Sequence, residues 1–306
     1  MSAPPPPGAD LAPFVGLYGT DKPLLDIYEV EGALFVSGRG LEHQPLQRAG
    51  PSLWASEAGG VVLRSADGES VAEIEGERFL RQDFAAAAAA QFRQQIAGDL
   101  PALRRRSTNA KPPAGASGSG EGLVEIGTVD PGIAIDMRYA SANNFIGTPL
   151  YDHSAAFLER DAAQALMRAQ ARLLAQGYRL VVLDAYRPWA VTWLFWEAVP
   201  VGLRQFCADP ASGSKHNRGC AVDVTLADAE TGALVEMPSG FDEPSVRASP
   251  DYRGSTSRAR WHRDLLRRAM ESEAFSVDPY EWWHYDFAGW ESRPIRNVPL
   301  SRLALG

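Results

Sequence analysis

A stretch rich in Pro, Gly and Ser interrupts this chain at residues 107–122 (STNAKPPAGASGSGEG). This composition favours a flexible linker, because glycine and proline break helices and strands and the small polar residues offer little apolar surface to bury. The linker divides a 306-residue chain into two parts, each long enough to build a core of its own. We therefore expect two globular parts, residues 1–106 and residues 123–306.

The part before the linker alternates apolar and polar residues over short runs, and each pair of runs flanks a dipeptide that ends in glycine. This pattern predicts short strands joined by tight turns, and so a small antiparallel β-domain. The runs and turns are 24–30 and 33–37 around Glu31-Gly32, and 61–64 and 71–74 around Asp67-Gly68. The alanine-rich residues 83–103 then favour helix. We assign no catalysis to this part, where His43 is a lone histidine.

The part after the linker mixes helical and extended patterns. Spacing of apolar residues predicts an α+β domain. The expected elements are extended chain at 124–136, a helix at 155–176 ended by Gly177, a strand at 178–184, a helix near Ala190, a strand at 221–226, a helix at 257–275 and a strand at 282–287.

Charge and hydropathy exclude two classes of protein. The formal net charge of -8 argues against a protein that reads a nucleic-acid backbone, since such binding depends on Lys and Arg meeting phosphates. No apolar run reaches the roughly 18 to 20 residues that a membrane span needs. The start, MSAPPPPGAD, lacks a signal-peptide pattern, but it could remain after a signal was removed. The location is periplasmic or envelope in that case, and otherwise cytoplasmic.

Two segments of the second part carry side chains suited to a metal site. Zinc in a catalytic site takes three nitrogen or oxygen ligands from the protein and leaves a fourth position open. His216, Asp223 and His284 satisfy that count. Gly219 allows a turn between His216 and Asp223, so that the chain can leave a loop and enter a strand with both side chains facing one ion.

Two further residues suit a hydrolytic reaction at such a site. Glu281 lies three residues before His284, where a bend near Asp278-Pro279 can bring both side chains into one cavity. A glutamate beside the metal can take a proton from water and pass it to a leaving amine. Arg187 follows the strand at 178–184, and its permanent charge suits it to stabilising an oxyanion.

These residues resemble the D-alanyl-D-alanine dipeptidases, zinc peptidases that share their fold with D,D-carboxypeptidases. The family pattern Ser-x-His-x-x-Gly-x-Ala-x-Asp fits residues 214–223 without a gap, and Glu-x-Trp-His fits residues 281–284. The run Glu-Trp-Trp-His favours the dipeptidase branch, as does Asp-Ala-Tyr-Arg-Pro at 184–188. The likeness extends from about residue 123 to about residue 295.

The resemblance implies one Zn²⁺ per chain and a catalytic domain with a mixed, mainly antiparallel sheet, here preceded by a small all-β domain. It implies hydrolysis of D-Ala-D-Ala or a similar free dipeptide, with Glu281 as general base and acid and Arg187 as the transition-state residue. Asp242 matches the region where the family holds the substrate's free amine, and Ser214 matches a substrate contact. A hydrogen bond within the loop is an equally good role for Ser214.

Several alternatives stay open. A D,D-carboxypeptidase would cleave N-acylated peptidoglycan stem peptides and would not need Asp242, whereas a non-hydrolytic wall-binding protein would use zinc only for structure or recognition. The N-terminal domain could contact peptidoglycan, position the enzyme in the envelope or only stabilise the fold. Cys207 and Cys220 could close a disulfide or remain two free thiols. We give His153 and His262 ordinary packing roles.

Overall fold

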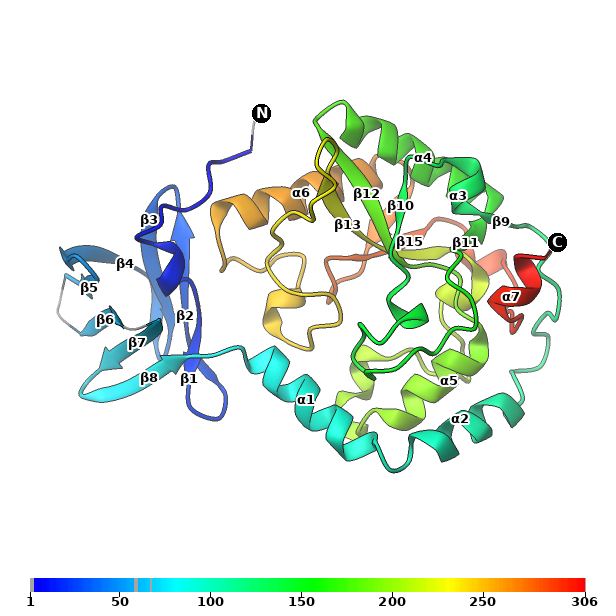
Figure 1. Ribbon diagram of the computed structural model, residues 1–306, viewed down its shortest axis with the longest axis horizontal. Helices are drawn as coiled ribbons and strands as arrows, with labels where there is room; N and C mark the ends of the chain where they lie inside the picture. Colours follow the sequence, from blue (N-terminus) through cyan, green and yellow to red (C-terminus); the bar gives the residue numbers. More distant parts are fainter. Residues whose placement is uncertain (1–2, 58–59, 67, 306) are drawn as a thin grey trace. The chain divides into compact units, whose positions relative to one another are not determined.

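The computed structural model of the chain describes residues 3–57, 60–66 and 68–305 (Figure 1). The chain divides into two compact units that are not contiguous in sequence. The barrel unit contains residues 1–88 together with residues 236–264, and the sheet unit contains residues 89–235 and 265–306. An N-terminal all-β barrel thus accompanies a separate mixed α/β region.

The barrel unit is built on eight strands that close into a barrel in sequence order. Each strand pairs antiparallel with the next, and the last returns to the first through the partners Tyr18 and Arg81. Closure leaves the barrel without the two open edges of a flat sheet. The strands are β1 (Gly16–Gly19), β2 (Pro23–Val30), β3 (Ala33–Gly38), β4 (Leu41–Gly50), β5 (Leu53–Ser56), β6 (Val61–Ala66), β7 (Glu69–Ile74) and β8 (Glu77–Arg81).

The four strands predicted in this region are confirmed as β2, β3, β6 and β7. The turn between β2 and β3 has positive φ at both of its residues, 50° at Glu31 and 84° at Gly32, which is the geometry that glycine-containing hairpin turns favour. Asp67 of the second predicted turn lies outside the described residues. The closure and the other four strands were not predicted. Each strand supplies only a few residues to the common core, so its apolar pattern is too short to be recognised in the sequence.

Two helices follow the barrel where one was predicted. α1 (Phe84–Ile96) and α2 (Leu100–Asn109) are separated by a short turn that contains Gly98. Pro101 stands at the start of α2, where its missing N–H costs no hydrogen bond. Residues 107–122 begin inside α2 and continue as an irregular segment, in which the Ser117 N–H donates to the Ile295 carbonyl at 2.7 Å.

A five-stranded sheet forms the centre of the sheet unit, in the order β10-β12-β13-β15-β14. β10 pairs parallel with β12, and all the other neighbours pair antiparallel. The strands are β10 (Ala134–Ile135), β12 (Tyr178–Asp184), β13 (Ala221–Asp228), β15 (His284–Phe287) and β14 (Phe275–Val277). The predicted strands at 178–184, 221–226 and 282–287 are confirmed.

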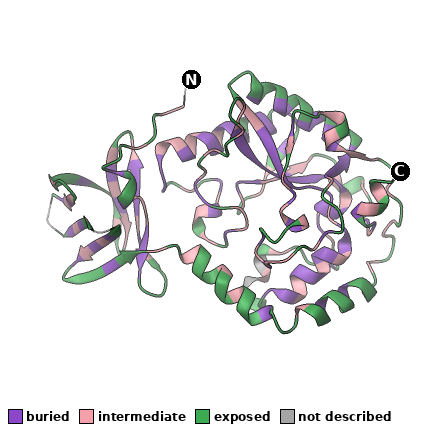
Figure 2. Ribbon diagram, in the orientation of Figure 1, coloured by how far each residue is buried: buried purple, intermediate pink, exposed green. Residues whose placement is uncertain are grey.

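Helices cover this sheet and complete the unit. Apolar residues spaced three or four positions apart bury one side of α4 (Arg160–Leu174), which contacts β12. Figure 2 shows β12 and β13 buried and the outer side of α4 exposed. The other helices are α3 (Ile126–Val129), α5 (Trp189–Ala198), α6 (Ser257–Glu271), which begins in the barrel unit, and α7 (Leu300–Leu303). The predicted helices at 155–176, near 190 and at 257–275 correspond to α4, α5 and α6.

The remaining elements are short. β9 (Leu123–Glu125) and β11 (Phe157–Glu159) form a separate two-stranded sheet. The 3-10 turns are η1 (Ala12–Phe14), η2 (Arg138–Ala140), η3 (Val201–Phe206), η4 (His216–Arg218), η5 (Val246–Ala248) and η6 (Trp290–Ser292). Neither Cys207 nor Cys220 forms a disulfide in the described part of the chain.

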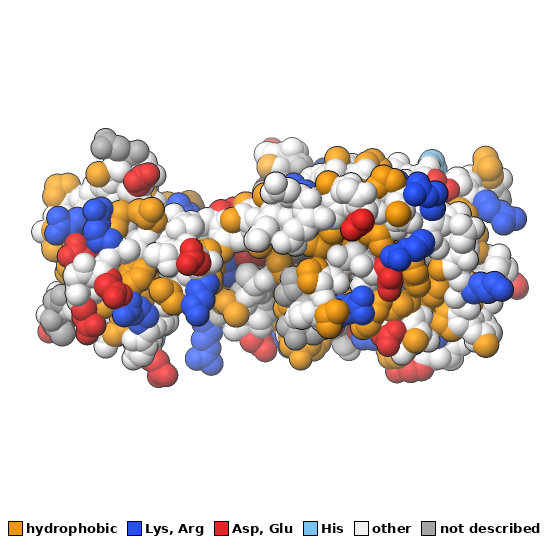
Figure 3. All heavy atoms as spheres, turned by 90° about the horizontal axis from the view of Figure 1, so that it is seen from below, with side chains coloured by type: hydrophobic (Ala, Val, Ile, Leu, Met, Phe, Trp, Pro, Cys, Tyr) orange, Lys and Arg blue, Asp and Glu red, His pale blue; other side chains and the backbone are white. Residues whose placement is uncertain are grey.

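Two surface properties bear on possible partners. Within the described part of the chain, no helix combines the length and the apolar character needed to cross a bilayer. Basic and acidic side chains are interspersed over the face shown in Figure 3.

A buried ion pair braces the turn η4 within the sheet unit. The Glu159 carboxylate, 2% exposed, contacts Arg296 at 2.6 Å and Arg293 at 3.1 Å. Arg296 also donates to the Arg218 carbonyl at 2.9 Å, while the Glu159 N–H donates to the Gly219 carbonyl at 2.8 Å. Arg296 and Glu159 are therefore both bonded to the main chain at the end of this turn.

We expect Glu159→Gln to lower the free energy of unfolding by about 3–5 kcal/mol, because the substitution leaves buried guanidinium charge without its partner. Urea denaturation followed by tryptophan fluorescence measures this change. The matched control is Arg172→Gln, which removes an exposed guanidinium and leaves Glu273 paired with Arg168, and which is expected to cost under about 1 kcal/mol. Equal losses in the two variants would contradict the role given to Glu159.

Candidate active site

A row of ionisable side chains crosses the central sheet. Asp184 at the end of β12 is the register partner of Asp223 on β13, and Asp223 is the register partner of His284 on β15. Residues directly opposite each other on paired strands project from the same face of the sheet. The strand register therefore places Asp184, Asp223 and His284 side by side.

The turn η4 brings His216 to this row. Its Nδ1 donates to the Ala185 carbonyl at 2.7 Å, and its Nε2 faces Asp223 and His284. Gly219 ends the turn with a φ of 70°, and a Cβ there would lie 2.4 Å from the Leu123 side chain. Glycine is thus required both by its conformation and by the close approach of β9.

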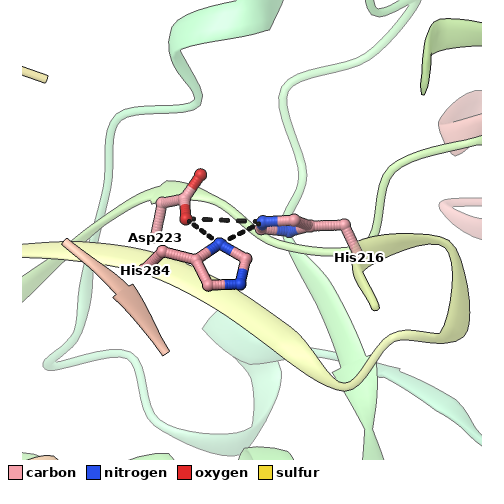
Figure 4. A group of neighbouring side chains, drawn as sticks. All are labelled: His216, Asp223 and His284. Atoms are coloured by element: carbon pink, nitrogen blue, oxygen red, sulfur yellow. Dashed lines mark hydrogen bonds and ion pairs between the residues drawn. The ribbon is translucent and has the colours of Figure 1, made fainter. Parts of the chain in front are cut away.

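Three atoms converge where these residues meet (Figure 4). His284 Nδ1 lies 3.0 Å from both Asp223 Oδ1 and His216 Nε2, and the last two atoms are 3.4 Å apart. Ligand atoms about 2.0 Å from a tetrahedral zinc ion are separated by about 3.3 Å, so this spacing fits such an ion. The three atoms supply two nitrogen donors and one oxygen donor, which leaves a fourth tetrahedral position for other groups.

Electrostatics at the row favour a cation. Burial acts to raise the pKa of Asp223, but His216 and His284 outweigh it and hold the pKa of this carboxyl well below its usual range. Burial opposes charge on His284 as well, yet Asp223 and Asp286 raise its pKa well above the usual value. The same carboxylates that favour a proton at His284 would favour a metal ion there.

Groups around the row orient His284. The Nε2 atom of His284 lies 3.0 Å from Asp286 Oδ1, and Lys215 forms an ion pair with the other oxygen of that carboxylate. A carboxylate behind a metal-binding imidazole fixes the ring and increases its basicity. Asp278 forms a second possible cluster with His284 and Asp286. Its Oδ1, however, also accepts a hydrogen bond from the Tyr280 N–H at 2.8 Å.

Glu281 stands at the bend just before β15. The His284 N–H donates to the Glu281 carbonyl at 3.2 Å, which closes the turn that the sequence suggested. Trp282 and Trp283 are buried behind it, at 2% and 1% exposure. Burial raises the pKa of Glu281 to about 8, with His284 lowering it and Asp223 raising it. A carboxylate that accepts a proton readily near neutral pH has the property that a general base needs.

Arg187 is held by contacts on several sides. Its Nε and Nη2 donate to Asp184 Oδ2 at 3.0 and 2.7 Å, and Nη2 lies 4.0 Å from Asp223 Oδ2. Its guanidinium also lies over the rings of Tyr139 and Phe195, at 5.2 and 4.8 Å. Burial disfavours the charge, but Asp184 outweighs it, so that the pKa of Arg187 lies well above its usual value.

Sequence reasoning did not assign roles to the residues that hold Arg187. The Tyr151 hydroxyl donates to Asp184 Oδ1 at 2.6 Å, so both oxygens of this fully buried carboxylate are engaged. The spacing of Asp184 and Arg187, three residues apart across a strand end, was the signal available for their pairing. Nothing in the sequence pointed to Tyr151, which comes from a distant irregular segment.

The other two predicted site residues lie in different units. Ser214 is buried in the sheet unit, and its Oγ accepts from the His216 N–H at 3.2 Å, which is the loop role that the sequence left open. Asp242 belongs to the barrel unit, within the segment 236–264 that interrupts the chain between β13 and the second half of α6. Its φ of 59° is left-handed.

Comparison with known proteins identifies the family. The family model described as D-ala-D-ala dipeptidase matches residues 119–297, more than half of the chain. The chain belongs to this D-ala-D-ala dipeptidase family. This confirms the resemblance, whose limits were expected at about residues 123 and 295, and it leaves the barrel strands outside the matched region.

Members of the D-ala-D-ala dipeptidase family from several bacteria resemble the chain. A D-alanyl-D-alanine dipeptidase of Escherichia coli K12 is 34% identical over 173 residues, which cover 56% of this chain and 88% of the relative. One of Enterococcus faecalis is 34% identical over 172 residues, covering 50% and 85%, and one of Enterococcus faecium is 32% identical over 182 residues, covering 54% and 90%.

We expect Asp223→Ala to abolish stoichiometric binding of Zn²⁺, whereas Asp278→Ala should retain it. The reason is that Asp223 contributes one of the three converging atoms, while Asp278 belongs only to the second cluster. Isothermal titration with Zn²⁺, checked by elemental analysis after dialysis, measures the stoichiometry. Loss of binding in Asp278→Ala with retention in Asp223→Ala would place the metal in the second cluster instead.

Proposed function

We propose that this chain is a zinc-dependent peptidase that hydrolyses D-Ala-D-Ala or a closely similar free dipeptide. The observation that carries the proposal is the convergence of His216, Asp223 and His284 at distances of 3.0 to 3.4 Å beside Glu281 and Arg187. Family membership and the names of the relatives support the same reaction. We also propose that the sheet unit carries the zinc D,D-peptidase fold.

In this proposal His216, Asp223 and His284 would hold one zinc ion. Zinc bound there would polarise the scissile carbonyl and increase the acidity of a water molecule. Glu281 takes a proton from that water, and later gives a proton to the nitrogen of the departing D-alanine. The raised pKa of Glu281 supports both steps, because the group must exchange a proton near neutral pH.

Arg187 stabilises the negative charge that develops on the carbonyl oxygen during attack. Asp184 and the rings of Tyr139 and Phe195 fix its side chain in advance, so that little reorganisation accompanies the reaction. Asp242 is proposed to bind the free ammonium group of the substrate, which would select a free dipeptide over an N-acylated chain. Ser214 is proposed to support the loop that carries His216 and to contact the substrate.

We expect Glu281→Gln to reduce release of D-alanine from D-Ala-D-Ala by about 10²–10⁴-fold, the range typical of losing a general base, while zinc content stays the same. A coupled assay for free D-alanine, run on zinc-loaded and chelated protein, measures the effect. Glu291→Gln is the matched control, because this glutamate is exposed.

The same assay separates the alternatives when an N-acetylated substrate is included. Cleavage of the free dipeptide, dependent on zinc and Glu281, supports the proposal. Preference for the acylated substrate would identify a carboxypeptidase instead. Absence of cleavage of either substrate by zinc-loaded protein would favour a binding protein.

We expect Arg187→Lys to lower kcat by about 10²–10³-fold with little change in KM, because a lysine cannot keep the two-pronged contact with Asp184 while facing the oxyanion. Steady-state kinetics on D-Ala-D-Ala separate the two constants. Arg160→Lys, at an exposed position on α4, serves as control. An unchanged kcat in Arg187→Lys would rule out the proposed oxyanion contact.

A further inference from the structure

The segment 236–264 covers the end of β2, which extends beyond its pairing with β1. β1 pairs with β2 only as far as Ile27, and β2 continues for three more residues. Beyond that point the Glu29 N–H donates to the Ser255 carbonyl at 3.0 Å. The Arg260 guanidinium donates to the Glu29 carbonyl at 2.8 Å. Both main-chain groups of Glu29 are thus satisfied by the segment, as a buried strand edge requires.

The Glu29 side chain makes a second connection. Its carboxylate, on a residue only 4% exposed, accepts from the Ser257 N–H at 2.7 Å, at the first residue of α6. It also accepts from the Gly32 N–H at 2.6 Å, within the hairpin turn of the barrel. A carboxylate at a helix N-terminus meets unpaired N–H groups and the positive end of the helix dipole. Glu29 therefore fastens the start of α6 to β2.

Asp26, three residues before Glu29 on β2, makes a third connection. The Tyr252 hydroxyl donates to its Oδ2 at 2.6 Å, whereas its Oδ1 is buried with no hydrogen-bond partner among the described residues. Gly254 lies directly against this pair: a Cβ there would be 2.2 Å from the Tyr252 hydroxyl and 2.3 Å from Asp26 Oδ2. The fit is close enough that glycine is required.

Contacts within the segment continue from this anchor to Asp242. Arg263 donates to the Tyr252 carbonyl at 2.6 Å. The Tyr252 N–H donates to the Ser249 carbonyl at 3.1 Å, and the Ser249 N–H donates to the Val246 carbonyl at 3.3 Å. Next to Val246, Arg247 donates twice to the Pro238 carbonyl at 3.0 and 2.8 Å. Glu243 in turn accepts from the Gly240 N–H at 3.0 Å. The chain on both sides of Asp242 is therefore tied into the network that Asp26 anchors.

The backbone of the segment needs such support. Asp242 and Ser255 both have left-handed φ values, 59° and 66°, in which a side chain crowds its own backbone. Such conformations persist when surrounding contacts determine them. Ser255 is held by its bonds to Glu29 and Arg260, and the turn at Asp242 by Arg247 and Glu243.

We propose that Asp26 and Glu29 of the barrel are positioning residues that fix the segment 236–264 and with it the conformation of Asp242, the residue proposed to bind the substrate's free ammonium group. This inference rests on the proposed function, because the role of Asp242 is itself proposed.

The test compares Tyr252→Phe with Tyr28→Phe in the full-length, zinc-loaded protein. Tyr252→Phe removes the hydroxyl that donates to Asp26. Tyr28 lies on β2, the strand that carries Asp26, and Tyr28→Phe removes a hydroxyl that bonds to Ser37 and His43 of the barrel. We expect Tyr252→Phe to raise KM for D-Ala-D-Ala about tenfold, with kcat within about twofold and cleavage of an N-acetylated analogue unchanged. Tyr28→Phe should leave all three constants as in the wild type.

Two further variants make the result decisive. Gly254→Ala should raise KM in the same way, because its Cβ displaces the Asp26–Tyr252 pair. Asp242→Asn should raise KM for the free dipeptide alone. Hydrogen exchange gives a readout besides activity: amides of 236–264 should exchange faster in Tyr252→Phe and Gly254→Ala, while those of β5 to β7 keep wild-type protection.

The possible failures are distinguishable. If Asp242→Asn raises KM but Tyr252→Phe and Gly254→Ala do not, the positioning role is overturned and the proposed function stands. If kcat on both substrates falls in parallel, the barrel contacts support only the fold, and the inference is again wrong. If the wild type does not cleave D-Ala-D-Ala, or Asp242→Asn has no effect on KM, the assigned role of Asp242 fails and the inference fails with it.

Discussion

The pairing of Asp223 with His284 across β13 and β15 is the constraint on which the rest of the sheet unit depends. It places a carboxylate and an imidazole on a buried face, where isolated charges are costly. Every neighbouring feature answers that cost. The His216 Nε2 atom lies beside the pair, and Asp286, itself paired with Lys215, contacts the other nitrogen of the His284 ring. The positive charge of Arg187 balances the negative charge of Asp184. The sheet is therefore organised around charge, with apolar packing behind it.

The local parts of this arrangement could be predicted from the sequence. A glycine between His216 and Asp223, a buried run at 178–184 and a bend before His284 each depend on neighbouring residues, and each is present in the structure. The predicted metal ligands meet because their motifs carry the turn chemistry that brings them together. Their roles remain proposals.

The parts that were not predicted depend on contacts between distant residues. Barrel closure requires β1 to meet β8, and no local pattern specifies which strand ends pair. The support that Tyr151 gives to Asp184 crosses 33 residues of sequence. The grouping of 236–264 with the barrel depends on Tyr252 and Ser257 meeting Asp26 and Glu29, residues more than 220 positions away. Such pairs of polar residues look like ordinary surface residues when each is read alone.

Because 236–264 groups with the barrel, the region that matches the family is not one compact unit. Residues 119–297 match the family, yet 236–264 within them form a compact unit with a barrel that lies outside the match. Without the barrel, the first N–H of α6 and the Tyr252 hydroxyl would lose their acceptors, and the left-handed Ser255 would lose its bond to Glu29. The region that carries the family's motifs is thus not structurally independent of the barrel in this chain, because one of its segments obtains its hydrogen bonds from β2.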